Sequence, residues 1–290
     1  MKCLILAAGY ATRLYPLTEN FPKPLLDVAG KPILNWLIED LEKGGQVSEY
    51  IVVSNHKFAD IFHDWASGEA VGPDGLARPS VGHARLDRAS HPITIIDDGT
   101  STNETRLGAV RDIQLAVEFL ANREMPDRVG HDGRLGNDGG IGHDSGIGQD
   151  GLLVMAGDNL LDFSLNEFVR YAHGKKASCV MRYDEEDETR LRRSGVATLG
   201  EGDRLLALTE KPAGPATHWC VPAFYYFTSS DVRLVKEAIE NGCGIDAPGS
   251  FIAWLCQRTE MYAWEMPGRR YDIGNLESYE EVKKTFAALK

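Results

Sequence analysis

The N-terminal stretch from Lys2 to Pro32 limits the possible folds of this chain more than any other part of the sequence. A short apolar run, residues 4–6, stops at three small residues, Ala7, Ala8 and Gly9. Backbone N–H groups can approach phosphate oxygens only where no side chain holds the ligand away. The pattern therefore predicts a buried strand that leads into a phosphate-binding loop.

The same loop carries two cations, Arg13 and Lys23. A planar guanidinium fork and a mobile ammonium are the groups that a polyphosphate needs besides backbone dipoles. The loop has neither the Gly-Lys-Ser/Thr ending of a Walker P-loop nor the G-x-G-x-x-G of a dinucleotide fingerprint. From spacing alone, phosphate binding and an ordinary strand-to-helix turn with surface charges both remain open.

The run LAAGYATRLYPLT, followed by PKPL and GKPI, resembles the N-terminal signature of nucleoside-diphosphate-sugar pyrophosphorylases, notably glucose-1-phosphate thymidylyltransferases. The resemblance extends over almost the whole chain, apart from the loop at 68–92 and a Gly-Asp repeat. These enzymes usually have Gly where this chain has Ala11, and we expect the added methyl group to stiffen the loop only slightly.

Composition narrows the classes of partner. A formal net charge of -12 argues against nucleic acid or an anionic membrane, since both require a basic surface. Five cysteines without C-x-x-C spacing suit reduced thiols. The apolar run before Gly9 is too short for a signal peptide, so we expect a soluble, cytoplasmic protein. The oligomeric state stays open, a homo-oligomer included.

Short apolar strands alternate with segments of helical periodicity, which predicts right-handed βαβ units. The fold class expected is therefore α/β, a Rossmann-like mixed, mainly parallel sheet flanked by helices, with residues 1–290 in a single domain. The main expected strands are 50–54, 93–96, 152–156, 177–182, 196–199, 205–209, 220–227 and 261–265, and the main expected helices are 33–41, 58–65, 106–120, 165–172, 231–241, 250–257 and 276–289.

The segment from Gly130 to Gly151 is a degenerate repeat of Gly-x-Asp. Its aspartates, together with His131 and His143, could suggest a calcium-binding β-roll. Such rolls need many stacked repeats, and fewer than four short ones cannot bury a core. We therefore expect a flexible insertion at about 126–151.

Two aspartates are candidate metal ligands. Asp158 follows the apolar strand 152–156, and ligands of open α/β sheets gather at the carboxyl ends of strands, so Asp158 is expected beside the Gly9 loop. Asp272 lies in YDIGN after two arginines. Two carboxylates with substrate phosphates and water suit Mg²⁺, although a turn or helix cap explains Asp158 equally well. The resemblance implies that both aspartates hold the catalytic metal.

The triplet Glu210-Lys211-Pro212 is by itself a weak signal, since exposed Glu-Lys pairs mostly belong to the solvated surface, and a functional role stays open. The resemblance implies that Glu210 binds sugar hydroxyls, that Lys211 binds the sugar phosphate, and that the backbone of Gly195 meets the sugar. Two departures from the family pattern, Ser194 in place of an aromatic residue and Pro222 in place of a small-Thr-Gly triplet, leave the acceptor open.

The segment from Asp97 to Ala109 occupies the position where the resembled enzymes bind the nucleotide base, which implicates Asn103 and Gly108. The Asn103 amide could pair with a pyrimidine edge. It could also cap a helix beginning near Glu104, since Asn is a favoured N-cap residue.

The function expected is a Mg²⁺-dependent nucleotidyltransferase that joins an NTP, with dTTP or UTP favoured, to a sugar 1-phosphate and releases pyrophosphate. Arg13 would hold the pyrophosphate, Lys23 would bridge the α-phosphate and the incoming phosphate, and Asp158 would help hold the metal. Two alternatives stay open: a cytidylyltransferase for phosphocholine or a sugar alcohol phosphate, and a non-catalytic nucleotide-sugar sensor.

Overall fold

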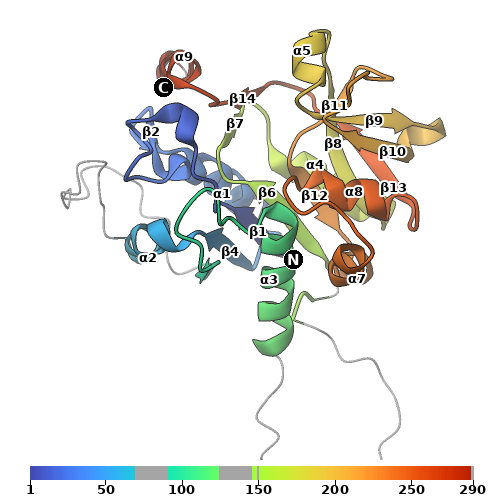
Figure 1. Cartoon of the computed structure of the whole chain (residues 1–290), viewed down its shortest axis with the longest axis horizontal. Helices are drawn as coiled ribbons and strands as arrows, with labels where there is room; N and C mark the ends of the chain where they lie inside the picture. Colours follow the sequence, from blue (N-terminus) through green and yellow to red (C-terminus); the bar gives the residue numbers. More distant parts are fainter. Residues whose placement is uncertain (69–90, 124–145, 149, 289–290) are drawn as a thin grey trace, which may run out of the picture.

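A computed structural model describes residues 1–68, 91–123, 146–148 and 150–288 (Figure 1). Its main sheet has the strand order β10-β9-β11-β8-β12-β6-β1-β4-β5, with β13 paired to β8. The strands are β1 (Lys2–Leu6), β2 (Asp27–Val28), β3 (Lys31–Pro32), β4 (Glu49–Ser54), β5 (Ile93–Asp97), β6 (Leu152–Ala156), β7 (Asn159–Leu161), β8 (Ser178–Asp184), β9 (Gly195–Leu199), β10 (Leu205–Glu210), β11 (Trp219–Val221), β12 (Phe224–Phe227), β13 (Met261–Glu265) and β14 (Arg270–Asp272).

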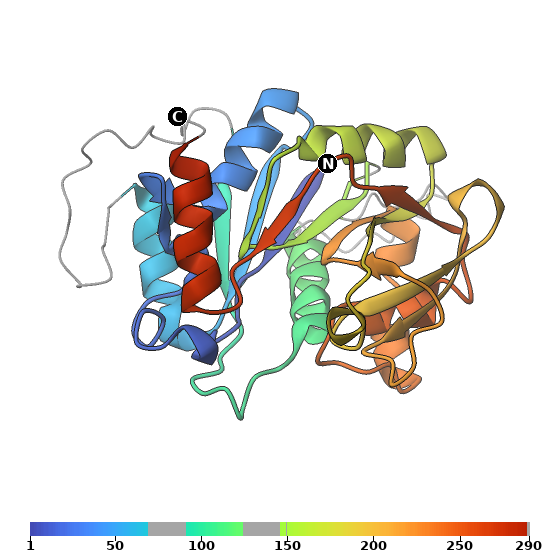
Figure 2. The ribbon, with the colours of Figure 1, turned by 90° about the horizontal axis from the view of Figure 1, so that it is seen from above.

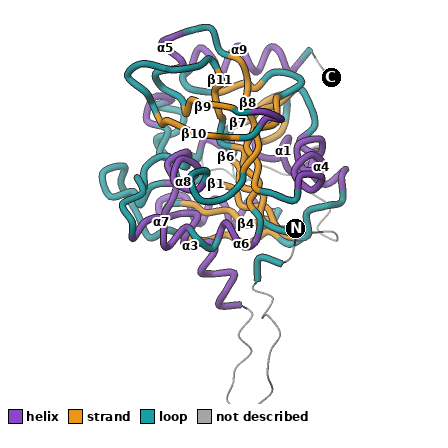
Figure 3. The backbone as a smooth tube through the Cα atoms, turned by 90° about the vertical axis from the view of Figure 1, so that its right-hand side faces the viewer, coloured by secondary structure: helices purple, strands orange, loops and turns teal. Residues whose placement is uncertain are grey.

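Helices cover both faces of this sheet (Figure 2), and the side view shows α1 and α4 on one side of the strands and α8 on the other (Figure 3). The helices are α1 (Ile33–Gly44), α2 (Ala59–Ser67), α3 (Ala109–Arg123), α4 (Leu165–Lys175), α5 (Glu188–Leu191), α6 (Ser229–Val232), α7 (Val235–Glu240), α8 (Gly249–Leu255) and α9 (Leu276–Ala287), with 3-10 turns η1 (Thr12–Leu14), η2 (Lys23–Leu25), η3 (His56–Phe58) and η4 (Glu201–Asp203).

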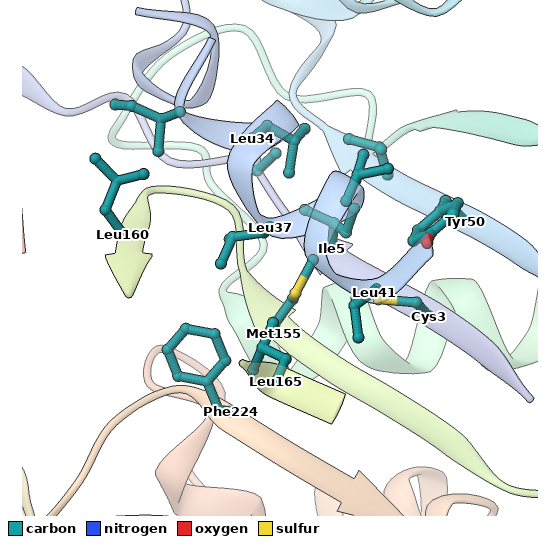
Figure 4. Close-up of a cluster of buried hydrophobic side chains, with 14 of the residues drawn as sticks. Cys3, Ile5, Leu34, Leu37, Leu41, Tyr50, Met155, Leu160, Leu165 and Phe224 are labelled. Atoms are coloured by element: carbon teal, nitrogen blue, oxygen red, sulfur yellow. The ribbon is translucent and has the colours of Figure 1, made fainter. Parts of the chain in front are cut away.

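The strands β5, β4, β1 and β6 pair in parallel, whereas β12 and the strands beyond it pair largely antiparallel. Alternate residues of each parallel strand enter different cores: Cys3 and Ile5 join one core, and Leu4 joins the other. The first core packs under α1 (Figure 4) and the second under α3. Burial on both faces explains why these strands are continuously apolar, and the α/β prediction with a mixed, mainly parallel sheet is confirmed.

Helix α1 shows how the local sequence specifies an element. Its apolar residues recur at helical spacing and are buried, with Leu34 and Leu37 among the side chains labelled in Figure 4. The helix ends where Gly45 adopts a left-handed conformation with φ 61°, which glycine reaches without steric cost. The predicted helix at this position is confirmed.

One predicted strand is divided. The apolar run 220–227 was expected as one strand, but it forms β11 and β12 on either side of Pro222 and Ala223. Cys220 faces Tyr183 of β8, whereas Tyr225 faces Val180, so five steps along one strand oppose three along the other. Proline has no N–H for the ladder, which accounts for a bulge at this point.

The bulge changes the neighbours of this strand. Before it, β11 pairs with β9, and Val221 faces Gly195. After it, β12 pairs with β6, and Ala223 accepts a hydrogen bond from the N–H of Ala156. The carboxyl end of β6, which Asp158 follows, and Gly195 at the beginning of β9 therefore lie on either side of the bulge.

No helix in the described part of the chain is long and apolar enough to cross a membrane. All five cysteines have free thiols. Most of the Gly-x-Asp repeat, with His131 and His143, lies outside the described residues, so the insertion at 126–151 stays a prediction, as does the single-domain organisation.

Candidate active site

A cleft of about 400 Å³ opens at the carboxyl ends of β1 and β6. Gly9 lies in its wall and is exposed, and a Cβ atom added there would meet nothing within 4 Å. The packing of the chain therefore does not require glycine at this position, whereas a ligand that approaches the backbone closely would. The cleft is lined by Leu6, Ala7, Gly9, Ala11, Thr12, Arg13, Leu14, Lys23, Pro24, Ala156, Asp158, Asp272, Ile273 and Gly274.

Hydrogen bonds from behind fix the course of the loop. Asn55 donates its side-chain amide to the carbonyl of Ala8, and Thr18 donates its hydroxyl to the carbonyl of Ala11. Ala11 has φ 46° and ψ 42°, a left-handed conformation that disfavours residues other than glycine. The expectation that alanine only slightly stiffens this loop was thus incomplete, because its Cβ also imposes backbone strain here.

The two predicted cations of the loop differ in environment. Arg13, on η1, is exposed and has no hydrogen bond or ion pair with any described residue. Lys23, at the start of η2, has only 7% of its surface exposed. The cleft therefore offers a mobile guanidinium that a ligand can engage and a fixed ammonium in its wall.

Lys23 lies beside both predicted metal ligands. Its Nζ donates to Oδ2 of Asp158 at 2.7 Å and is 3.7 Å from Oδ1 of Asp272. A two-stranded antiparallel sheet of β7 and β14 brings the aspartates together, because it pairs Asp272 with Asn159, the residue after Asp158. These two three-residue strands were not predicted, since neither shows any periodic pattern.

Arg270 supplies a second cation that the sequence analysis did not assign. Its Nη1 donates to Oδ1 of Asn159 at 2.7 Å and is 3.7 Å from Oδ2 of Asp272. Burial would raise the pKa of Asp158, but the ion pair and hydrogen bond with Lys23, together with the charge of Arg270, hold it below its ordinary value. The carboxylate of Asp158 is therefore charged at neutral pH, as a metal ligand must be.

The two carboxylates fit the donor set of a hard cation. The side chain of Asp158 is 35% exposed and that of Asp272 is 54% exposed, and both line the cleft. In the described ranges, no three His, Cys, Asp or Glu side chains form a group that could hold a metal. A cation here would take its remaining ligands from water and substrate phosphates, the mode typical of Mg²⁺.

A second group of predicted residues surrounds Glu210 at the end of β10. The carboxylate lies between two glycines: a Cβ at Gly195 would be 3.1 Å from its Oε2, and a Cβ at Gly249 would be 2.1 Å from it. Burial raises the pKa of Glu210. The sequence analysis missed Gly249, because no local pattern connects the start of α8 with β10.

Lys211 follows Glu210 in a left-handed conformation with φ 48°. Its N–H donates to the carbonyl of Ser194, so the chain turns sharply out of β10. Its Nζ is 3.9 Å from Oδ2 of Asp246, and 54% of the side chain is exposed. Lys211 is therefore a strained, exposed lysine at a strand end, and such backbone strain concentrates at functional sites.

The proposed cap role of Asn103 is wrong. Helix α3 begins at Ala109, not near Glu104, because Gly108 has φ 91° and breaks the helical run. The first N–H groups of α3 donate to main-chain carbonyls of Ile245 and Asp246. Asn103 instead lies in the preceding loop, where its backbone and side-chain oxygens accept hydrogen bonds from Arg106.

The predicted site residues thus form two groups. Among the described residues, the cleft lining includes Ala7, Gly9, Arg13, Lys23, Asp158 and Asp272, with Ala8 just behind the wall. The lining does not include Asn103, Gly108, Gly195, Glu210 and Lys211. The first group lines the cleft at the carboxyl ends of β1 and β6, and in the second group Gly195 is the first residue of β9 and Glu210 is the last of β10.

The fold and the cleft define the class: an open α/β protein with charged side chains gathered at the carboxyl ends of its central strands. The sequence profile of the nucleotidyl transferase family matches residues 2–124 and 141–288. This chain belongs to that family, and the resemblance noted in the sequence is confirmed at this level.

Curated relatives differ in the nucleotide that their names give. The glucose-1-phosphate adenylyltransferase of Fervidobacterium nodosum is 22% identical over 96% of this chain and 59% of the relative. The mannose-1-phosphate guanylyltransferase catalytic subunit beta of Danio rerio is 23% identical over 94% and 61%. This chain therefore spans about three fifths of their length. The UTP–glucose-1-phosphate uridylyltransferase AglF of Haloferax volcanii is 24% identical over 98% of this chain and 96% of the relative.

Solved structures share the fold. A UDP-glucose pyrophosphorylase complexed with UDP-glucose superposes with a TM-score of 0.71 at 17% identity, over 100% of this chain and 99% of the other. A UTP-bound UGPase from Acinetobacter baumannii gives a TM-score of 0.69 at 14% identity, over 100% and 94%.

Proposed function

We propose that this chain is a Mg²⁺-dependent nucleotidyltransferase that joins an NTP to a sugar 1-phosphate, giving an NDP-sugar and pyrophosphate. The observation that carries the proposal is Lys23, buried between Asp158 and Asp272 in a cleft whose lining also includes Gly9 and Arg13, and Arg13 has no ion pair with any described residue. This arrangement combines a place for a hard cation with cations and an open backbone for phosphates.

The reaction needs no general base. A sugar phosphate is already an anionic nucleophile near neutral pH, and its oxygen attacks the α-phosphorus of the NTP as the bond to pyrophosphate breaks. The barrier arises from bringing two anions together, so positioning and charge neutralisation lower it. Arg13 binds the departing pyrophosphate, and Lys23 bridges the α-phosphate and the incoming phosphate.

Asp158 and Asp272 would hold Mg²⁺, which supplies further neutralisation of charge at the α-phosphate when it is bound. Lys23 contacts both carboxylates and favours the ionised form of Asp158. On the acceptor side, Glu210 accepts hydrogen bonds from sugar hydroxyls, and Lys211 anchors the sugar phosphate. The backbone of Gly195 lies against the same carboxylate and contacts the sugar.

For the nucleotide we favour dTTP or UTP, bound between Ala7, Ala8 and Gly9 on one side and Asn103 and Gly108 on the other. The uridylyltransferase name of the relative that matches over nearly its full length supports this choice. A cytosolic location suits the supply of NTPs and the free thiols, and the net charge of -12 supports small anionic substrates bound in a local basic cleft rather than nucleic acid.

One observation favours a second acceptor class. Pro222 forms the bulge between Val221, which faces Gly195, and Ala223, so it removes a backbone donor beside the acceptor residues. A phosphocholine acceptor, with CTP as donor, needs fewer hydrogen bonds at this position than a sugar ring, because its quaternary ammonium group makes none. The chain would then be a cytidylyltransferase.

Pyrophosphate release with Mg²⁺ tests both candidates, with dTTP, UTP, CTP, ATP and GTP each combined with a panel of sugar 1-phosphates and phosphocholine. Turnover that requires one NTP and one sugar 1-phosphate is the expected result. A dominant CTP and phosphocholine pair would favour the cytidylyltransferase. Folded protein that binds a nucleotide but releases no pyrophosphate with any combination would contradict the enzymatic proposal and point to a nucleotide-sugar sensor.

A further inference from the structure

The segment that precedes α8 crosses from the acceptor residues to the start of α3. The carbonyl of Ile245 accepts the N–H of Val110 at 3.0 Å, and the carbonyl of Asp246 accepts that of Ala109 at 3.2 Å. A Cβ at Gly108 would be only 2.5 Å from the Ile245 oxygen. These main-chain contacts fix the backbone of Asp246 independently of its side chain.

The side chain of Asp246 contacts one cation on each side. Its Oδ1 accepts from Nε of Arg106 at 3.1 Å and from Nη2 at 2.8 Å. Its Oδ2 lies 3.9 Å from Nζ of Lys211. The pKa of Glu210, raised mainly by burial, is raised further by the charge of Asp246. One carboxylate is therefore shared between the nucleotide loop and the proposed phosphate anchor.

Arg106 carries this connection on to Asn103. Its Nη1 donates to the Asn103 carbonyl at 3.2 Å and to Oδ1 at 3.3 Å. A guanidinium can only donate, so it selects the amide orientation that directs Oδ1 toward Arg106. The Nδ2 donors of Asn103 are then left for a base. The orientation of this amide depends on Arg106, and that of Arg106 depends on Asp246.

We propose that Asp246 is a positioning residue that couples nucleotide binding to acceptor binding, an inference that rests on the proposed function. Without acceptor, Asp246 divides its charge between Arg106 and Lys211. An acceptor phosphate replaces Asp246 on Lys211 and leaves the carboxylate to Arg106, which holds Asn103 for the base. The same carboxylate thus competes with the acceptor and assists the nucleotide.

The expected effects are modest, because both ion pairs are exposed and such pairs contribute little. We expect Asp246→Asn to lower the KM for the acceptor about threefold to fivefold, since the competitor for Lys211 is gone. The KM for the NTP should rise by about the same factor. The opposite changes in the two KM values separate a positioning role from a structural defect, since loosening of α3 would weaken the binding of both substrates.

The experiment measures steady-state kinetics with UTP and glucose 1-phosphate for the wild type, Asp246→Asn, Arg106→Gln and the double variant. Arg106→Gln should reproduce the UTP effect, and the double variant should add nothing to it. Asp203→Asn is the matched control, because Asp203 is an exposed aspartate with an arginine nitrogen at the same 2.8 Å, and neither KM should change. Parallel rises of both KM values, or additive UTP effects, would overturn the proposal.

A second readout does not depend on turnover. Acetylation of Lys211 by acetic anhydride, quantified by peptide mass spectrometry, should be about threefold faster in Asp246→Asn, because the amine loses its ion pair with the neighbouring carboxylate. Equal labelling rates in the wild type and in Asp246→Asn would overturn the claim that Asp246 pairs with Lys211. If the wild type shows no turnover while Asp246→Asn is still labelled faster than the wild type, only the proposed function is refuted.

Discussion

Replacing Gly249 with alanine tests the assignment of Glu210 with little disturbance of the fold. The added Cβ would be 2.1 Å from Oε2 of Glu210, whereas ordinary contact begins at 3.4 Å, so this oxygen must move by about 1.3 Å. The displaced atom is the end of a flexible side chain, and it moves more easily than backbone. Gly195 lies close on another side of the same oxygen and restricts the directions that remain.

The magnitude follows from the hydrogen bond that the displaced carboxylate can no longer make. A hydrogen bond to a charged acceptor contributes about 1.5–3 kcal/mol, and its loss lowers the rate roughly 10- to 150-fold. We expect this fall in kcat/KM for the acceptor, with the KM for the NTP unchanged. Stability should stay equal or rise by up to about 1 kcal/mol, because alanine is a better helix former than glycine.

The assay combines acceptor-dependent pyrophosphate release with thermal unfolding followed by circular dichroism. Gly174→Ala is the matched control, since Gly174 also lies in a helix, α4, but a Cβ there would meet nothing within 4 Å. The control should keep full activity. A Gly249→Ala variant with kcat/KM within twofold of the wild type would refute the acceptor role of Glu210.

Three further predictions follow from the cleft and the second core. Asp158→Asn and Lys23→Ala should each reduce turnover at least about 100-fold, because each loses ~3 kcal/mol of preorganised charge stabilisation. Their circular dichroism spectra should stay native. Near-normal activity in both variants would refute the site. Gly9→Ala should keep the wild-type melting temperature but weaken NTP binding, measured by calorimetry, about tenfold or more, because the added methyl group points into open space that a ligand would fill. Unchanged affinity would contradict a close approach of the NTP to the Gly9 backbone. Burial, with a smaller contribution from Asp98, raises the pKa of Asp112 from 3.8 to about 7, so the native state retains a proton that the unfolded chain has lost and stability falls as the pH rises between these values. Asp112→Asn should therefore melt several degrees above the wild type at pH 8 and by a smaller margin at pH 4.5, and an equal margin at both would contradict this assignment.

The elements that the sequence predicted well are those buried on one consistent face or on both. The apolar runs at 152–156 and 261–265 became β6 and β13 with the same bounds, because β6 is buried on both faces and β13 buries alternate residues on one face. The rule that ligands gather at the carboxyl ends of strands placed Asp158 beside the Gly9 loop, and both residues line the cleft.

The features that were missed depend on contacts between distant segments. The pairing of β7 with β14, which brings Asp272 to Asp158, involves three residues on each side and no periodic pattern. The bulge at Pro222 was noted only as a lost donor, although it changes the partner of a whole strand. The apolar spacing from Arg106 onward suggested an earlier helix start, but the positive φ of Gly108 and the distant Ile245 determine where α3 begins.

The way in which α3 begins also affects how nucleotide choice can change. Its first N–H groups are satisfied by main-chain carbonyls of Ile245 and Asp246, which any side chains at those positions would still provide. The loop before the helix, including Asn103, therefore does not have to cap the N-terminus of α3. If the loop contacts the base as proposed, substitutions there can alter base preference without weakening the helix, so a randomised library at residues 101–107 can explore new nucleotides at little cost in stability.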